Sequence, residues 1–228
     1  MASMYETIMD LPLFKGVGRN QISQFLEKTQ LHFINFQRED ILISQGEACD
    51  SVRFLISGRV KVSRTNLENT LTLSETSAKG RLFGAERLYG IDTRLPFTVK
   101  ALESCSIMEF SKQQFQTLLY SDSIYMLNFF NYLSLRSQRP VDSLAAYTSG
   151  DLATRLALWV AVATEPESTE ITVTGDLPAL EKATNLSTEA LNEQLEALRR
   201  RRILTYGRKS IRVLSRRKLI DFALPAGK

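Results

Sequence analysis

The sequence is poor in the side chains from which most enzyme and metal sites are built. It contains one histidine, two cysteines and one tryptophan in 228 residues. Catalytic zinc and haem sites draw on histidine and cysteine ligands, and a four-thiolate iron–sulfur cluster needs four cysteines. A nucleophile elbow and a Walker-type phosphate loop are also missing from the sequence. We therefore expect a protein that is not an enzyme and that holds no metal or other cofactor.

The few cysteine and histidine residues are also spaced like ordinary structural residues. Cys49 and Cys105 lie 56 positions apart and form no CxxC motif, which argues against a disulfide framework. We expect both to be reduced, mostly buried thiols. The single histidine, His32, falls in a segment that reads as a β-strand, and we interpret it as a strand residue.

Long hydrophobic runs are missing as well. The longest apolar stretch, 152–163, spans 12 residues and contains Arg155, whereas a membrane-spanning helix needs about 20 apolar residues. Residues 1–9 lack the positive cluster and apolar run of a secretory signal. The sequence thus predicts a cytoplasmic protein without a membrane partner.

Positive charge is concentrated near the C-terminus. Residues 199–218 hold ten Lys or Arg and no acidic residue, while the other positions hold 19 basic and 25 acidic residues, a net charge of −6. Fixed positive charge in one small region favours a polyanionic partner, because phosphates release their counterions to it. A solvated charged surface without a partner is the alternative interpretation.

Hydrophobic spacing divides the chain into a helical, a strand-rich and a second helical region. Residues 5–30 predict two short helices separated by a breaker at 16–18. Short strands are then predicted at 31–36, 41–43, 52–56, 59–63, 70–74, 97–101 and 104–110. Many short strands joined by glycine turns such as Ser57-Gly58 favour a sandwich, jelly roll or small barrel.

The region after residue 111 predicts a helix to 121 and a long helix over 124–147. The long helix carries one stripe at heptad-like positions: Leu127, Phe130, Ser134, Ser137, Val141 and Leu144. Such a stripe would suit a coiled-coil seam between two copies, and a helix lying on its own β-roll would show a similar one. Because proline removes a backbone donor, Pro140 predicts a kink or break near 138–140.

The C-terminal residues predict a compact module. Its elements are a helix at 152–163 capped by Asp151, a strand at 171–173, helices at 177–183 and 188–201, and a hairpin of strands 203–205 and 210–213. The turn 184–186 between the last two helices contains Asn185, which tolerates a left-handed conformation. Ser187 would cap the second helix, and its buried stripe would be Leu191, Leu195 and Leu198.

This order of elements resembles the Crp/Fnr family of bacterial regulators from about residue 10 to residue 215. The motifs that carry the resemblance are Gln45-Gly46, Phe54-Leu55-Ile56-Ser57-Gly58, Phe83-Gly84, Val99-Lys100-Ala101 and Asn185-Leu186-Ser187-Thr188-Glu189. The resemblance implies an α+β fold: an N-terminal double-stranded β-helix (a cyclic-nucleotide-binding-like jelly roll), a long dimerisation helix and a C-terminal winged helix-turn-helix. The corresponding domains would be 1–122, 123–150 and 151–228.

The same resemblance implies a sequence-specific transcription regulator that acts as a homodimer on double-stranded DNA, with RNA polymerase as a further partner. The predicted DNA-binding residues lie on the outer face of the second helix, in the basic run after it and at the hairpin tip. They are Ser187, Thr188, Glu189, Asn192, Glu193, Arg199, Arg200, Arg208 and Lys209.

The sensor region departs from the cyclic-nucleotide-binding members of the family. Those members present a Gly-Glu pair to the ribose and an Arg-Ser or Arg-Thr pair to the phosphate, where this sequence has Gly84-Ala85 and Leu95-Pro96. A partly buried phosphate needs charged donors, so we expect no tight cAMP binding. The effector is left open: a small molecule near 83–97, a protein partner or none. The predicted effector-binding residues are Phe83, Gly84, Ala85, Arg94, Leu95 and Pro96.

The second helix of the pair also departs from the family. Thr188 and Glu193 stand where well-studied members carry arginines, and only Glu189 is retained. A glutamate accepts from cytosine and repels phosphate, so base readout should differ. The alternative function is a protein-interaction module with a degenerate sensor and no sequence-specific DNA binding. Glu193 favours that alternative, and the basic stretch opposes it.

Overall fold

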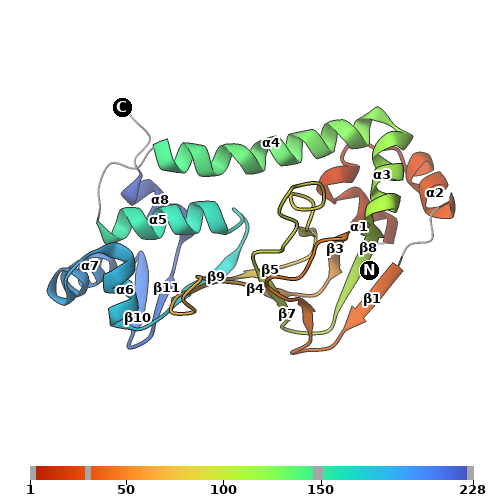
Figure 1. Cartoon of the computed structure of the whole chain (residues 1–228). Coiled ribbons are helices and arrows are strands. Elements are labelled where there is room, and N and C mark those ends of the chain that lie inside the picture. Colours follow the sequence, from red (N-terminus) through yellow and green to blue (C-terminus); the bar gives the residue numbers. More distant parts are fainter. Residues whose placement is uncertain (1–3, 29–31, 146–150, 225–228) are drawn as a thin grey trace. The chain divides into compact units, whose positions relative to one another are not determined.

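The computed structural model describes residues 4–28, 32–145 and 151–224, and Figure 1 gives the labels of the helices and strands. The chain forms two compact units. The N-terminal unit comprises Met1–Lys61 and Ser77–Ser137, and the C-terminal unit comprises Val62–Thr76 and Gln138–Lys228. The segment Val62–Thr76 therefore groups with the C-terminal residues, although strands of the N-terminal unit flank it in the sequence.

The N-terminal unit is rich in short antiparallel strands, as the glycine-punctuated sequence predicts. One sheet has the order β1 (His32–Phe36), β8 (Cys105–Ser111), β3 (Ser51–Ser57) and β6 (Leu82–Phe83). A second pair joins β2 (Ile41–Ile43) to β7 (Thr98–Ala101). The predicted strand positions agree within one or two residues, except that the strand predicted at 70–74 lies at Thr72–Ser77. Leu31 lies outside the described residues, and β6 was not predicted.

Helices cover this β-rich domain through an aromatic core. They are α1 (Met4–Met9), the 3-10 helix η1 (Pro12–Phe14), α2 (Arg19–Lys28), α3 (Lys112–Ser121) and α4 (Ser123–Ala145). Phe14 of η1 packs edge-on against Tyr125 of α4 and Phe54 of β3, with ring centroids 5.6 and 6.1 Å apart. Asn128 of α4 fixes η1 further, because its amide donates to the carbonyl oxygens of Leu13 and Lys15.

Helix α4 runs from Ser123 to Ala145 without interruption. The break predicted near 138–140 is therefore wrong. Proline removes only one backbone donor, and the residues on both sides of Pro140 keep the helical conformation. The predicted extension to Tyr147 lies outside the described residues, as do the side chains of Val141 and Leu144 and the expected hinge at 146–150.

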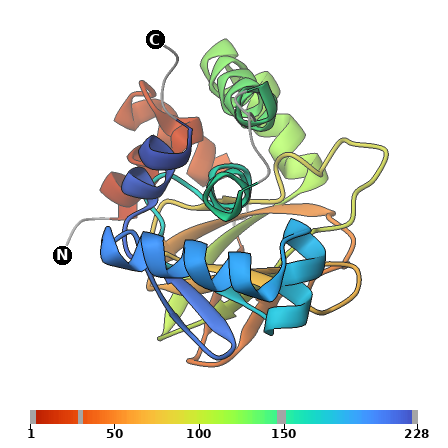
Figure 2. The same cartoon turned by 90° about the vertical axis from the view of Figure 1, so that its left-hand side faces the viewer.

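The C-terminal unit contains the elements that the sequence predicts for it. They are α5 (Leu152–Ala163), β9 (Thr169–Thr174), α6 (Leu177–Thr184), α7 (Thr188–Arg200), β10 (Leu204–Gly207) and β11 (Ser210–Val213). A further helix, α8 (Arg216–Ala223), was not predicted. Figure 2 presents α6 in cyan and α7 in blue toward the viewer. The predicted caps are confirmed: Asp151 accepts from the amide of Thr154 at 2.7 Å, and Ser187 accepts from that of Ala190 at 3.3 Å.

The turn between α6 and α7 also follows the sequence prediction. Asn185 adopts the left-handed conformation with φ 53° and ψ 40°, which ends α6 and lets α7 start three residues later, at Thr188. Leu191, Leu195 and Leu198 of α7 are buried in the core of the unit. Because the three leucines recur at helical spacing, they share one face of α7, and the opposite face of the helix is exposed to solvent.

An inserted hairpin completes the sheet of the C-terminal unit. It consists of β4 (Val60–Thr65) and β5 (Thr72–Ser77), and β5 pairs antiparallel with β9, which pairs in turn with β11. The hairpin tip is closed by Asn66, whose side-chain oxygen accepts from the amides of Thr70 and Leu71 at 2.9 and 3.0 Å. A segment from the middle of the strand-rich region thus extends the sheet of the C-terminal module beyond β9.

A buried carboxylate holds this hairpin in place. The side chain of Glu75 on β5 is 0% exposed and accepts from the guanidinium of Arg64 on β4 at 3.1 Å. Its second oxygen accepts from the backbone amide of Glu165 at 2.9 Å and from the hydroxyl of Ser168. One acidic side chain therefore joins both strands of the hairpin to the turn between α5 and β9.

We predict that Glu75→Gln lowers the stability of the C-terminal unit by about 2–3 kcal/mol, because it leaves the mostly buried Arg64 without its charged partner. The measurement is urea unfolding followed by the fluorescence of Trp159, the only tryptophan. The matched control is Glu68→Gln in the same hairpin. It breaks the exposed pair with Lys182 and should cost less than about 0.5 kcal/mol. Equal losses in both variants would contradict the role assigned to Glu75.

Candidate nucleic-acid interface and sensor pocket

Most of the DNA-binding residues predicted in the first turns of α7 lie on its solvent-exposed side. Glu189, Asn192 and Glu193 are exposed, while Thr188 is half-buried and donates its hydroxyl to Glu181 of α6. Hydrogen bonds from its own backbone amide and from Ser187 hold the pKa of Glu189 below its usual value. The start of α7 therefore presents a charged carboxylate beside its free amides, an arrangement that the helix dipole stabilises.

Basic side chains surround the other end of α7. Arg199 and Arg200 are exposed and both bind Glu196, at 2.9 and 3.2 Å. The hydrogen bond from Arg199 is the main reason that the pKa of the Glu196 carboxyl is lowered. Because these pairs lie at the surface, they cost little to open. The two arginines remain available to an incoming anion.

The hairpin β10–β11 carries Arg208 and Lys209 at its exposed turn. The turn is fixed to the start of α6, because the amide of Gly175 donates to the carbonyl oxygen of Lys209 at 3.0 Å. Tyr206 at the base of the hairpin donates to Glu196 of α7 at 3.3 Å. A groove of about 700 Å³ separates the hairpin from α7, and its lining includes Asn192, Tyr206, Arg208 and Lys209.

The predicted effector residues lie in the N-terminal unit and do not form an open pocket. Phe83, Gly84, Ala85 and Leu95 are buried, whereas Arg94 and Pro96 are exposed. The space lined by Ile43, Glu47, Ala48, Cys49, Ser51, Arg53, Phe83, Gly84 and Leu95 has an empty volume of only about 180 Å³. A purine nucleotide needs several hundred cubic ångströms. The described arrangement therefore leaves no room for one.

An internal ion-pair network fills this position. Arg53 of β3 donates to Glu109 of β8 at 2.6 Å, to Glu47 at 2.7 Å and to the carbonyl oxygen of Leu42 at 3.2 Å. Burial opposes the charged form of Arg53, but the hydrogen bonds to both glutamates outweigh it and raise the pKa of Arg53. The guanidinium nearest to the closed pocket is already engaged with two carboxylates. Sequence reasoning missed this network, because Glu109 lies 56 residues from Arg53 in the chain.

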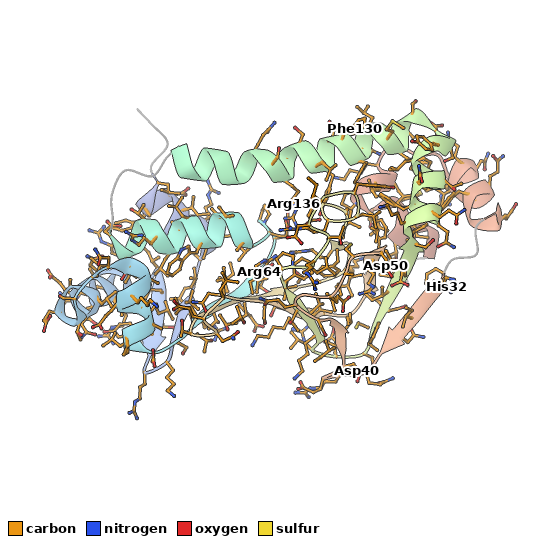
Figure 3. The ribbon with its side chains drawn as sticks, viewed as in Figure 1. His32, Asp40, Asp50, Arg64, Phe130 and Arg136 are labelled. Atoms are coloured by element: carbon orange, nitrogen blue, oxygen red, sulfur yellow. The ribbon has the colours of Figure 1, made fainter. Side chains whose placement is uncertain are left out.

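The charged neighbours of the missing family residues are also engaged elsewhere. Glu86, next to Ala85, accepts from Arg136 of α4 at 3.0 Å, and Figure 3 shows Arg136 on the side of α4 that faces the strands. Arg94 donates to the carbonyl oxygen of Gly46 at 3.1 Å. A phosphate-binding guanidinium and a ribose-binding carboxylate are therefore not brought together. The residues present do not fit a cyclic nucleotide.

The cysteines and the histidine lie as the sequence predicts. Cys49 and Cys105 are free and buried, and burial raises the pKa of both thiols. His32 is the first residue of β1 and is labelled in Figure 3. Within residues 4–28, 32–145 and 151–224, no group of three or more His, Cys, Asp or Glu side chains is placed to hold a metal ion. In the same ranges, no helix is long and apolar enough to cross a membrane.

Comparison with known proteins identifies the strand-rich domain. Residues 33–122 match the family model of the cyclic nucleotide-binding domain. A curated relative is the potassium channel KOR1 of Oryza sativa subsp. japonica, which is 29% identical over 115 residues. That match covers 49% of this chain and 13% of the channel, so the chain spans only a small part of the relative's length.

Two solved structures share the fold. The Thermus thermophilus Catabolite Activator Protein aligns with a TM-score of 0.52 and 18% identity over 93% of this chain and 98% of its own. The sensor domain of the transcriptional regulator DNR from Pseudomonas aeruginosa aligns with a TM-score of 0.51 and 20% identity over 60% of this chain and 90% of its own. The chain thus contains a jelly-roll-like domain of the cyclic nucleotide-binding class. The resemblance to Crp/Fnr regulators is confirmed at the level of this fold.

We predict that calorimetric titration with cAMP or cGMP gives no binding in the submicromolar range. The physical reason is that the pocket is closed and that the charged donors a buried phosphate needs are engaged elsewhere. Submicromolar affinity for either nucleotide would contradict this description of the pocket, because it would require the Arg53 network to open at little cost.

Proposed function

We propose that this protein is a sequence-specific DNA-binding transcription regulator of the Crp/Fnr type whose sensor domain does not bind cAMP tightly. The observation that carries the proposal is the joint exposure of one face of α7 and of the basic hairpin tip beside it. In this interpretation α6, α7 and the hairpin β10–β11 are a winged helix-turn-helix. The proposed domains are a β-roll sensor at 1–122, a dimerisation helix and hinge at 123–150 and a DNA-binding domain at 151–228.

The exposed face of α7 supports a role in reading bases. An α-helix fits the major groove of B-DNA, where amide and carboxylate side chains can pair with base edges. Asn192 suits adenine, and Glu189 and Glu193 suit the amino group of cytosine. The caps Ser187 and Asn185 fix where this helix starts. A rigid start matters because the first turns of such a helix make the base contacts.

The basic side chains support a separate role in holding the phosphate backbone. Arg199 and Arg200 at the end of α7 and Arg208 and Lys209 at the hairpin tip are exposed. Contacts to phosphate set affinity and register without reading sequence. They would also offset the repulsion between phosphate and the carboxylates of α7.

The surface of α4 supports a homodimer. Tyr125 and Phe129 are buried against the N-terminal unit, whereas Leu127 and Phe130 of the predicted stripe are 58% and 57% exposed. Figure 3 shows Phe130 on the outer side of α4. The stripe is therefore not the face that packs on the β-roll of its own chain, which favours the coiled-coil seam over the alternative. RNA polymerase as a further partner is proposed on the resemblance alone.

A protein-interaction module without sequence-specific DNA binding is the second candidate function. The observation that favours it is the negative charge on α7, where Glu189 and Glu193 are both exposed. Those carboxylates repel a phosphate backbone at long range. The two functions differ in one measurable property, the recovery of a DNA sequence motif.

The proposal is tested by selecting binding sites from a pool of random duplex DNA at two salt concentrations. We expect a roughly palindromic motif with half-sites about one helical turn apart. Arg199→Gln/Arg200→Gln should weaken binding to every sequence and reduce the salt dependence by about two phosphate contacts. Asn192→Ala should change the motif itself, because it removes a base-reading group.

The matched control is Arg217→Gln/Lys218→Gln, which removes the same charge from exposed positions of α8. It should leave the motif and the affinity nearly unchanged. Salt-sensitive binding without an enriched motif would reduce the proposal to electrostatic attraction. An absence of binding at both salt concentrations would overturn it in favour of the interaction module.

A further inference from the structure

One carboxylate on α7 binds three side chains at once. Glu196 lies one turn after Asn192, and its side chain is 27% exposed. Its Oε1 accepts from Nη2 of Arg199 at 2.9 Å, and its Oε2 lies 2.9 Å from Nε of the same guanidinium. Nε of Arg200 donates to Oε1 at 3.2 Å, and the hydroxyl of Tyr206 donates to Oε2 at 3.3 Å. Glu196 is therefore a shared acceptor for the basic end of α7 and for the adjacent hairpin.

The pair between Glu196 and Arg199 has the two-pronged geometry of a strong arginine–carboxylate contact. Residues three and four positions apart are neighbours on a helix surface, so Arg199 and Arg200 can both reach the same carboxylate. A single exposed ion pair contributes little, but a bidentate pair inside a network of charges contributes more. Glu196 also raises the pKa of Arg199 through this hydrogen bond. The contacts therefore favour the paired arrangement in the free protein.

The carboxylate of Glu196 occupies donors that a phosphate would use. Phosphate and carboxylate oxygens accept the same charge-assisted hydrogen bonds from the planar fork of a guanidinium. Arg199 and Arg200 are 57% and 78% exposed, so a phosphate can approach both from solvent. The edge of Arg199 formed by Nε and Nη2 is already engaged with Glu196. A phosphate that takes this edge must first displace the carboxylate.

We propose that Glu196 is an internal competitor of the phosphate backbone and sets the affinity of the basic end of α7. In the free protein its carboxylate offsets part of the charge of Arg199 and Arg200. On a polyanion, the guanidiniums exchange the carboxylate for phosphate, while Tyr206 still donates to the released Glu196. A polymer that offers several phosphates at once gains most from this exchange, because each contact also releases counterions. The choice of DNA as the polymer rests on the proposed function, whereas the competition for the arginines does not.

A double-mutant cycle separates competition from simple charge repulsion, since both predict tighter binding once Glu196 loses its charge. The full-length protein, Glu196→Gln, Arg199→Gln/Arg200→Gln and the triple variant are titrated with heparin and with a short fluorescent duplex of arbitrary sequence. We expect Glu196→Gln to tighten binding to both probes about fivefold, the size of a strong exposed ion pair. In the background without the two arginines, the same change should tighten binding by less than about twofold.

The matched control is Asp221→Asn on α8. It removes the same charge and releases Arg217 from an exposed pair at 3.5 Å. Because Arg217 lies outside the proposed interface, binding to either probe should change by less than about twofold. The melting temperatures of all variants are compared first. Glu196→Gln should lower stability only slightly, because it removes pairs on the surface of one helix.

Three outcomes would overturn the proposal. Equal tightening with and without the arginines would mean that Glu196 acts only through long-range repulsion. Weaker binding by Glu196→Gln would mean that the carboxylate positions the arginines and does not compete for them. No binding of heparin or duplex by either protein would mean that these arginines take up no polyanion. A preserved cycle on heparin without an enriched DNA motif would support the competition and reject only the sequence-specific function.

Discussion

The pairing of β5 with β9 is the constraint on which the C-terminal unit depends. The strands β9, β10 and β11 would otherwise form a small sheet with an unpaired edge at β9. Strand β5 covers that edge, and the buried Glu75 ties it to the turn at 165–168. Because a buried carboxylate without its cation is costly, the hairpin and the module stabilise each other. The proposed DNA interface is built on this sheet.

In the strand-rich domain of the N-terminal unit, internal contacts fill the predicted ligand position. Its strands keep the cyclic nucleotide-binding fold, but the buried aliphatic side chains of Ala85 and Leu95 stand where cyclic-nucleotide-binding members carry ligand-binding groups. Arg53, Glu47 and Glu109 satisfy one another across β3 and β8.

The sequence predicted most helices and strands because the local signals agreed with the global fold. Asn185, Ser187 and Asp151 each cap or end an element where their chemistry requires it. The unbroken course of α4 through Pro140 was not predictable, because its neighbouring helical turns outweigh one lost backbone donor. The sequence also did not predict that residues 62–76 belong to the C-terminal unit. The pairing of β5 with β9 joins residues about 100 positions apart and leaves no local signal in the sequence.

The candidate sites also differ in how far the sequence predicts them. Exposed residues of α7 and of the hairpin tip follow from helical periodicity and turn chemistry, so the sequence located them. The Arg53 network depends on residues brought together only by folding. Hydroxyl-radical footprinting of the full chain on a selected duplex tests the proposed function most directly. We predict two symmetric protected segments about one helical turn apart. A single protected segment, or uniform weak protection along the duplex, would contradict a homodimer that reads DNA through two copies of α7.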